Sequence, residues 1–222
     1  RCPNHVLQSS APNRKECQTM SASSHPTAPS SSAIPSRFPA PELDDLPEDI
    51  RASILAVQDK AGFVPNVFLT FARRPEEFRA FFAYHDALME RAECALTKGE
   101  REMIVTVTSA VNDCLYCVVA HGAVLRIREK SNTLSDQIAT NYRKADITDR
   151  QRAMLDFALK VAGPDSGRIG EDDYSTLHAH GFDDETIWDI AAISAFFGMS
   201  NRMANATGMM PNAEFYTMGR SF

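Results

Sequence analysis

Apolar residues recur every three to four positions along most of the chain after residue 47, which is the period of α-helices that bury one face. The stretch EDIRASILAVQDKAG at residues 48–62 is an example. Ile50, Ile54, Leu55 and Val57 are expected near one face, as in an amphipathic helix. Gly62 then ends the stretch, as glycine commonly does after the last turn of a helix.

The same pattern predicts six more helices. They begin at about Pro75 and after Thr97, or lie within residues 114–130, 146–163, 170–181 and 183–208. No window alternates apolar and polar residues for long enough to predict a β-strand. The predicted fold is therefore all-α, a helical bundle of about seven or eight helices. Because the last of these helices is apolar around much of its circumference, we expect it to be buried, at a contact between subunits.

The first 40 residues differ from the rest of the chain. Their second half is almost entirely Ser, Ala, Pro and Thr, which cannot bury enough apolar area to offset the entropy lost on ordering. We therefore expect a disordered N-terminal arm at residues 1–40 and one helical domain at residues 41–222. Because the chain opens with Arg1, Met20 is a candidate for the native start. A mitochondrial transit peptide is the alternative for the arm, in which Glu16 is the only acid, but the basic residues are sparse.

Composition and charge narrow the classes of function. Hydrophobic residues make up 44% of the chain and charged residues 23%, as in ordinary soluble domains. The sequence lacks the uninterrupted apolar stretch of about 18 residues that a membrane span needs. The net charge of -6 leaves no excess of basic residues to bind a phosphate backbone. We therefore expect neither a membrane nor a nucleic acid as a partner, and a cytoplasmic location, with the mitochondrion as the alternative.

Two of the five cysteines form a tight pair. Cys2 and Cys17 lie in the arm, and Cys94 stands apart. Cys114 and Cys117 are separated by only two residues. An odd count with one close pair is not typical of a secreted disulfide scaffold and favours an intracellular protein with a specialised pair.

The pair belongs to the stretch VNDCLYCVVAHG, residues 111–122. If Asp113 is the N-cap, Cys114 occupies the first helical position. At the helical rotation of about 100° per residue, Cys114, Cys117 and His121 fall within a sector of roughly 60°. The three side chains are therefore expected to share one face of the helix.

This position suits redox chemistry. The unpaired N–H groups and the positive end of the helix dipole favour a thiolate in the first turn. One sulfur then becomes nucleophilic, and the other is close enough to resolve its oxidised form. His121 can accept or relay a proton, because histidine titrates near neutral pH. The preceding helix supplies Glu100 and Glu102, and either of them reaches the cluster if the two helices meet at the break between them.

Other interpretations of these residues remain open. The pair can be inert core, and a zinc site would need a fourth ligand or an open position. His178 and His180 are the nearest candidates for such a ligand, but on a helix they point about 200° apart. We assign five further residues to packing or surface: His85, Cys94, Tyr116, Trp188 and Met199.

Two motifs together resemble a known family. EREMI at residues 100–104 and CLYCVVAH at residues 114–121 resemble the AhpD-like alkylhydroperoxidase branch of the carboxymuconolactone decarboxylase family. The family pattern has a Glu twelve residues before Cys-x-x-Cys-x-x-x-His, a spacing that Glu102 meets and Glu100 does not. The ending FFGMSNRMANATGMMPNAEFY and the segment FVPNVFL look like the peroxidase-related subgroup. The likeness covers roughly residues 40–218.

The resemblance implies an all-helical homo-oligomer, a trimer or a hexamer. It implies that Cys117 is the peroxidatic thiolate, which becomes a sulfenic acid, and that Cys114 resolves it as an intramolecular disulfide. Glu102 and His121 would serve as the proton relay. AhpD itself has a histidine immediately before the second cysteine, where this chain has Tyr116.

The sequence therefore predicts an oxidoreductase, a thiol-dependent peroxidase that acts on hydroperoxides and is regenerated by a thiol or a protein reductant. No flavin or nicotinamide fingerprint is evident, so we expect no cofactor and no metal. Two alternatives remain open. One is a disulfide reductase or redox adaptor for a partner protein, and the other is a non-enzymatic, metal-binding oligomeric scaffold.

Overall fold

The computed structural model describes residues 35–220, and every regular element in that range is helical. The all-α prediction is confirmed, but the expected count of seven or eight helices is too low, because this range contains ten α-helices. The α-helices are α1 (Glu48–Ala61), α2 (Asn66–Ala72), α3 (Pro75–Met89), α4 (Lys98–Val111), α5 (Leu115–Glu129), α6 (Leu134–Asn141), α7 (Asp149–Ala162), α8 (Glu171–Ala179), α9 (Asp184–Thr207) and α10 (Glu214–Thr217). Three short 3₁₀ helices are η1 (Leu43–Asp45), η2 (Tyr142–Lys144) and η3 (Ser166–Arg168).

The three helices that the pattern did not predict are short. Helices α2, α6 and α10 contain 7, 8 and 4 residues. A helix of about two turns or fewer shows little periodicity in sequence and is not stable alone, because nucleation is costly. Packing stabilises these helices: Phe71 of α2, Ile138 of α6 and Phe215 of α10 are all buried. Their existence therefore depends on the rest of the fold.

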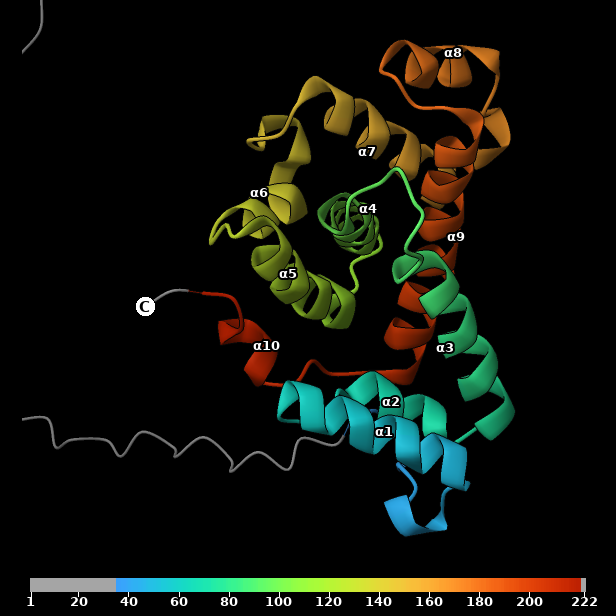
Figure 1. Ribbon diagram of the computed structural model, residues 1–222, viewed down its shortest axis with the longest axis vertical. Helices are drawn as coiled ribbons and strands as arrows, with labels where there is room; N and C mark the ends of the chain where they lie inside the picture. Colours follow the sequence, from blue (N-terminus) through green and yellow to red (C-terminus); the bar gives the residue numbers. More distant parts are fainter. Residues whose placement is uncertain (1–34, 221–222) are drawn as a thin grey trace, which may run out of the picture. The chain divides into compact units, whose positions relative to one another are not determined.

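Helix α4 is the central element of the helical domain. It contacts α5, α6, α7 and α9, and Figure 1 shows it end-on among them. The expected capping box begins it: the Thr97 hydroxyl accepts the N–H of Glu100 at 3.0 Å, and the Glu100 carboxylate accepts the N–H of Thr97 at 3.0 Å. Residues from Gly99 to Ser109 are buried without interruption. Glu100 and Ser109 in this stretch find hydrogen-bond partners inside the protein, whereas the buried hydroxyls of Thr106 and Thr108 have none within residues 35–220.

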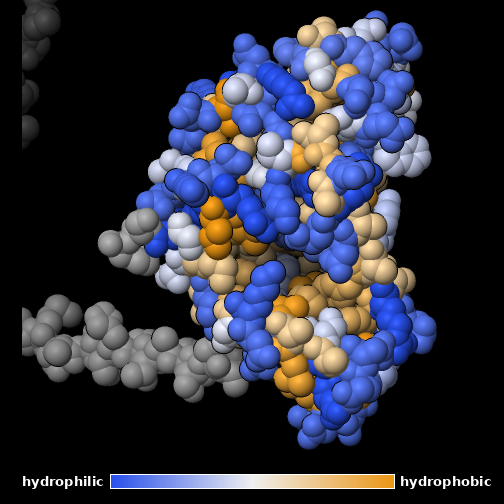
Figure 2. Space-filling view, viewed as in Figure 1, coloured by the Kyte–Doolittle hydropathy of each residue, from blue (hydrophilic) through white to orange (hydrophobic). Residues whose placement is uncertain are grey.

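Helix α9 packs one face against α3, α4, α5 and α7. Ile190, Ile193 and Phe197 are buried on that face. In the single chain the other face is open, with Trp188 72% exposed and Met199 44% exposed. The prediction that subunits cover α9 therefore stays a prediction. On the side of the molecule that Figure 2 shows, hydrophobic side chains gather in patches between polar areas.

The predicted arm at residues 1–40 lies mostly outside the described residues, and its disorder stays a prediction. Its last six residues are described, and they pair with the end of α9 and the segment after it. The N–H of Arg37 donates to the carbonyl of Thr207 at 2.7 Å, and the N–H of Met210 donates to the carbonyl of Pro35 at 3.2 Å. None of the helices between residues 35 and 220 is long and apolar enough to cross a membrane.

Candidate functional site: a buried cysteine pair at a helix N-terminus

The cysteine pair lies where α4 ends and α5 begins. Asn112 is the C-cap of α4, and Asp113 adopts the left-handed conformation with φ 51°. The N–H of Cys114 donates to the carbonyl of Ser109 at 3.0 Å, which closes the turn. The prediction that Asp113 caps α5 is wrong: Cys114 is the N-cap, and the helix begins at Leu115. The reason is conformational, because an N-cap needs an extended backbone, which Cys114 has and Asp113 does not.

As N-cap, Cys114 uses its sulfur in place of the usual oxygen. The Cys114 Sγ accepts the N–H of Cys117 at 3.4 Å. Both cysteines carry free thiols in the core, with Cys114 0% exposed and Cys117 3% exposed. The two sulfurs and the first turn of α5 therefore form one hydrogen-bonded unit.

This arrangement divides the proton unequally between the two sulfurs. The Cys117 side chain donates a hydrogen bond to Cys114 and, with the Cys117 backbone N–H, lowers the pKa of Cys114 to about 7 despite its burial. The hydrogen bond to Cys114, followed by burial and the charge on Cys114, raises the pKa of Cys117 well above its ordinary value. The first proton that the pair loses therefore leaves a thiolate at Cys114, with the Cys117 thiol donating to it.

Glu102 and His121 meet on the same side of the pair. The Oε2 atom of Glu102 lies 2.8 Å from the Nδ1 atom of His121, and Glu102 is only 8% exposed. The carboxylate therefore holds the imidazole with Nδ1 as the donor, which leaves Nε2 for exchange of a proton. The edge of the Phe197 ring, centred 4.8 Å from the imidazole, packs against it.

Of the two acids that the local sequence left open, Glu102 makes the contact and Glu100 does not. Glu100 caps the start of α4 and pairs with Arg150 at 2.6 Å. Residues two positions apart on a helix point about 200° from each other, so Glu100 and Glu102 face different sites.

A cavity of about 330 Å³, the thiol cavity, opens onto the pair. Cys117 and His121 line it, whereas Cys114 is fully buried. Helices α1, α2, α3, α5, α9 and α10 contribute the rest of its wall. The wall is largely aromatic, with the rings of Phe68, Phe81, Phe82, Phe197 and Phe215. Its volume and apolar wall suit a small organic molecule.

The thiol cavity also contains residues that sequence reasoning did not select. His85 and Asp86 of α3 line it, and the His85 Nδ1 atom lies 3.0 Å from Asp86 Oδ1. His85 was assigned to packing or surface because nothing in the sequence links α3 to the cysteine pair. Tyr116 both lines the cavity and packs: it is buried, and its hydroxyl accepts the N–H of Val67 at 3.2 Å, which ties the start of α2 to α5. Burial raises the pKa of the Tyr116 hydroxyl far above its ordinary value.

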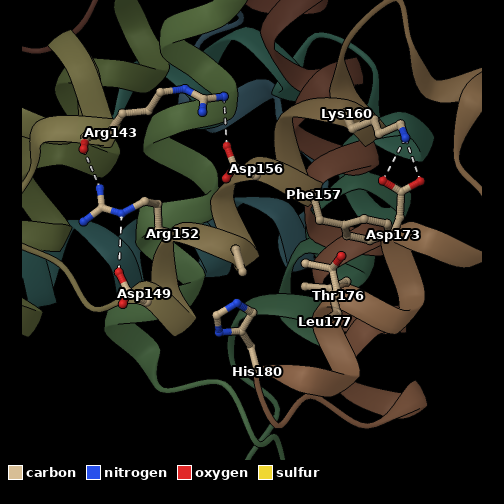
Figure 3. Close-up of a pocket in the computed structure, with 11 residues that line it drawn as sticks. Arg143, Asp149, Arg152, Asp156, Phe157, Lys160, Asp173, Thr176, Leu177 and His180 are labelled. Atoms are coloured by element: carbon tan, nitrogen blue, oxygen red, sulfur yellow. Dashed lines mark hydrogen bonds and ion pairs between the residues drawn. The ribbon is translucent and has the colours of Figure 1, made fainter.

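A larger cavity of about 550 Å³, the α7–α8 cleft, has a different character. Figure 3 shows its charged side chains directed at one another. Lys160 pairs with Asp173 at 2.6 Å, and Arg143 pairs with Asp156 at 3.0 Å. Because these charges are already paired and no cysteine is among the described residues that line the cleft, we place the chemistry in the thiol cavity.

The histidines considered as zinc ligands, His178 and His180, lie at α8, away from the cysteine pair. His178 contacts Asp184 at 2.8 Å, and His180 lines the α7–α8 cleft. Within residues 35–220 no three or more His, Cys, Asp or Glu side chains are grouped to hold a metal ion.

Comparisons with known proteins identify the family of the chain. The family model described as the carboxymuconolactone decarboxylase family matches residues 75–163, which contain Glu102, both cysteines and His121. No curated protein sequence matches the chain significantly.

Several solved structures share the fold. A peroxidase-related protein from Ralstonia eutropha JMP134, described as an alkylhydroperoxidase AhpD core, is 68% identical, with a TM-score of 0.82, covering 84% of this chain and 97% of that one. A peroxidase-related protein from Silicibacter sp. TM1040 is 44% identical, with a TM-score of 0.79, covering 84% of this chain and 96% of that one. The debrominase Bmp8 is 19% identical, with a TM-score of 0.67 over 81% of this chain and 94% of its own, a likeness of fold alone. The chain thus belongs to the AhpD-like, peroxidase-related branch of the carboxymuconolactone decarboxylase family.

Proposed function

We propose that the protein is a thiol-dependent peroxidase that reduces organic hydroperoxides. One observation carries this proposal: a cysteine pair that holds a thiolate near neutral pH lies beside a Glu102–His121 pair, in a cavity large enough for a small organic molecule. A thiolate is the nucleophile that attacks the peroxide oxygen, and a histidine can act as the acid that protonates the leaving alkoxide.

The two sulfurs would take different parts in the reaction. Cys117 is the sulfur that a substrate in the cavity meets, while the charge rests on Cys114. As the hydroperoxide approaches, the Cys117 thiol passes its proton to Cys114, and the Cys117 sulfur attacks the terminal peroxide oxygen. The O–O bond breaks, Cys117 becomes a sulfenic acid, and protonated His121 gives its proton to the departing alkoxide to form an alcohol.

The second half of the reaction forms the disulfide. Cys114 gives its proton to His121, which is now neutral, and attacks the sulfur of the Cys117 sulfenic acid. The S–O bond breaks, and the departing hydroxide takes the proton from His121 as water. In total, two thiols and one hydroperoxide give one disulfide, one alcohol and one water. A thiol reductant then returns the pair to its starting state by thiol–disulfide exchange.

Burial of the pair favours this proposal over a disulfide reductase. To reduce a disulfide on the surface of a folded partner protein, the attacking sulfur has to approach along the S–S bond of that disulfide. Cys117 is only 3% exposed, so its sulfur is poorly placed for this approach. A small hydroperoxide matches the volume of the thiol cavity, which Cys117 lines. The proposed homo-oligomer remains part of the proposal, with the open face of α9 as its contact surface.

The test follows the cysteine pair in one peptide. Trypsin releases residues 102–126, which contain both cysteines, as a single fragment. After one addition of cumene hydroperoxide to the reduced protein, we expect this fragment to lose two hydrogen atoms as a disulfide, measured by mass spectrometry. In Cys114→Ser, Cys117 has no resolving partner, so a dimedone adduct should accumulate on it instead.

Cys94→Ser is the matched control, because Cys94 is a partly buried free cysteine that bonds to Asp189 rather than to the site. It should react like the unaltered protein. A fragment that stays reduced while hydroperoxide is consumed, or that stays reduced with no consumption, would refute the proposal.

A further inference from the structure

A buried asparagine of α9 lies beside the cysteine pair. Asn201 is 0% exposed, and its side chain joins a polar network in an otherwise apolar part of the core. Its Nδ2 donates to the Ser109 hydroxyl at 2.9 Å, and its Oδ1 accepts from the Asn112 side chain at 3.1 Å. Burying an amide without hydrogen bonds costs free energy, and the hydrogen bonds of this network offset that cost for Asn201.

The network holds both ends of the turn that carries Cys114. Ser109, which accepts from Asn201, also accepts the N–H of Cys114 through its carbonyl. Asn112, which donates to Asn201, is the C-cap of α4. A second residue of α9, Asn205, donates to the Asn112 carbonyl at 2.9 Å from an exposed position. Helix α9 therefore holds the connection between α4 and α5 in place through its side chains.

Asn201 also acts on the sulfurs themselves. An amide nitrogen carries two N–H groups, and the Ser109 hydroxyl takes only one of them. After the Cys117 side chain and backbone N–H, the Asn201 side chain also lowers the pKa of Cys114. It opposes the rise in the pKa of Cys117 that Cys114 and burial cause. The Asn201 amide, which bonds to both ends of the turn that carries Cys114, therefore also favours the negative charge of the pair.

The other charged or titratable groups near the pair come from three helices, and α3 contributes His85 and Asp86 on the wall of the thiol cavity. Helix α5 contributes Tyr116 and His121, and α4 contributes Glu102, which bonds to His121. From α9, the side chains that act on the sulfurs are the uncharged Asn201 and Ser200. A neutral donor from α9 favours a thiolate without adding a charge that would have to be balanced.

We propose that Asn201 is a positioning residue of the cysteine pair, which keeps the Cys114 sulfur at the N-terminus of α5 and donates an N–H to its thiolate. This inference rests on the proposed redox function of the pair, and it adds the residue that sets the reactivity of the pair from outside the Cys-x-x-Cys motif. The same network explains why α9 bears the amide of Asn201 in the interior: it serves the turn that leads into another helix.

The test is the pH dependence of thiol alkylation. Reduced protein is treated with iodoacetamide over a range of pH, and labelling of the fragment at residues 102–126 is followed by mass spectrometry. Loss of one hydrogen bond to a charged group should raise the apparent pKa of the pair in Asn201→Ala by about one unit. Asn201→Asp, of nearly the same shape, should raise it further, since a carboxylate beside a thiolate disfavours the charge.

Two further variants separate positioning from a merely structural role. Asn205→Ala loses a bond to the same turn from an exposed position, so it should leave the apparent pKa unchanged. Asn201→Ser keeps a donor and should recover part of the shift. If Asn201→Ala lowers the thermal midpoint but leaves the apparent pKa where it was, the inference is overturned, and the same holds if the folded Asn201→Asp protein shows no rise.

Alkylation requires no hydroperoxide, so the two proposals fail separately. A shift in apparent pKa in protein whose pair is not oxidised by hydroperoxide would support the role of Asn201 and refute the peroxidase. If hydroperoxide oxidises the pair normally but the apparent pKa is the same in every Asn201 variant, the result supports the peroxidase and refutes the role of Asn201.

Discussion

The thiol cavity and the α7–α8 cleft show that size and charge do not identify the reactive region of this molecule. The cleft is the larger, at about 550 Å³ against about 330 Å³, and it has more charged side chains. Its charges neutralise one another, as Lys160 and Asp173 do. The thiol cavity has few polar groups, but Cys117 and His121 face its interior in an apolar environment where electrostatic interactions are strong. A reactive site needs groups that are held but not fully paired.

The largest difference between the thiol cavity and the α7–α8 cleft is expected when Cys117 is replaced. Cys117→Ser removes the sulfur that meets the substrate, and we expect peroxidase turnover to fall by about three orders of magnitude or more. Asp156→Asn, in the α7–α8 cleft, should leave turnover unchanged. Consumption of cumene hydroperoxide under steady-state conditions measures both variants. Equal losses in the two would mean that the thiol cavity is not the site.

The next largest effect is expected at the carboxylate that orients His121. Glu102→Gln removes the charge that holds the imidazole, so kcat/KM for hydroperoxide should fall by about a hundredfold, within the range of general acid–base catalysis. Glu100→Gln is the matched control on the same helix, since Glu100 faces Arg150 instead. Its kcat/KM should stay the same, and a comparable fall there would remove the distinction between the two acids.

The acidity of the pair predicts a pH dependence. Because hydrogen bonds lower the pKa of Cys114 from 9.0 to about 7, the thiolate forms as the pH rises through about 7. The rate of disulfide formation should therefore decrease by about tenfold as the pH falls from about 8 to about 6. Stopped-flow measurement of oxidation checks this profile. A rate that rises only near the ordinary pKa of cysteine would contradict the proposed hydrogen bonding.

The smallest effect is expected in the α7–α8 cleft. Lys160→Met breaks the pair with Asp173, which is partly solvent-exposed, and should lower the free energy of unfolding by at most about 1 kcal/mol. The Lys160 ammonium and the Gly170 N–H hold the pKa of Asp173 below its ordinary value, so this contribution is present at neutral pH and is lost in acid as Asp173 is protonated. Urea denaturation at neutral and acidic pH checks it, with unchanged turnover as the control.

Much of the fold followed from the periodicity of the sequence. Each of the seven stretches with a strong helical pattern is a helix, and the capping box at Thr97 is present. Helices α2, α6 and α10 escaped prediction because they are too short for periodicity to show and are stable only when packed. That subunits cover the exposed face of α9 stays a prediction, since sequence shows how apolar a helix is but not which of its faces finds a partner.

Part of the candidate site, like part of the fold, could be predicted from the sequence. Sequence spacing was enough to place Cys114, Cys117 and His121 near one another, because they lie within two turns of one helix. It could not show that Asp113 turns left-handed and leaves Cys114 as the N-cap, nor which sulfur holds the charge. It also gave no sign of His85 or Asn201, which reach the site from helices far away in sequence.

The sequence by itself therefore determined the helices and the local grouping of reactive side chains, because both depend on spacing along one helical period. Only the tertiary structure decided which carboxylate meets His121, what encloses Cys117 and how the two sulfurs share a proton. These features depend on burial and on contacts between helices that are distant in the chain, and no local pattern encodes such contacts.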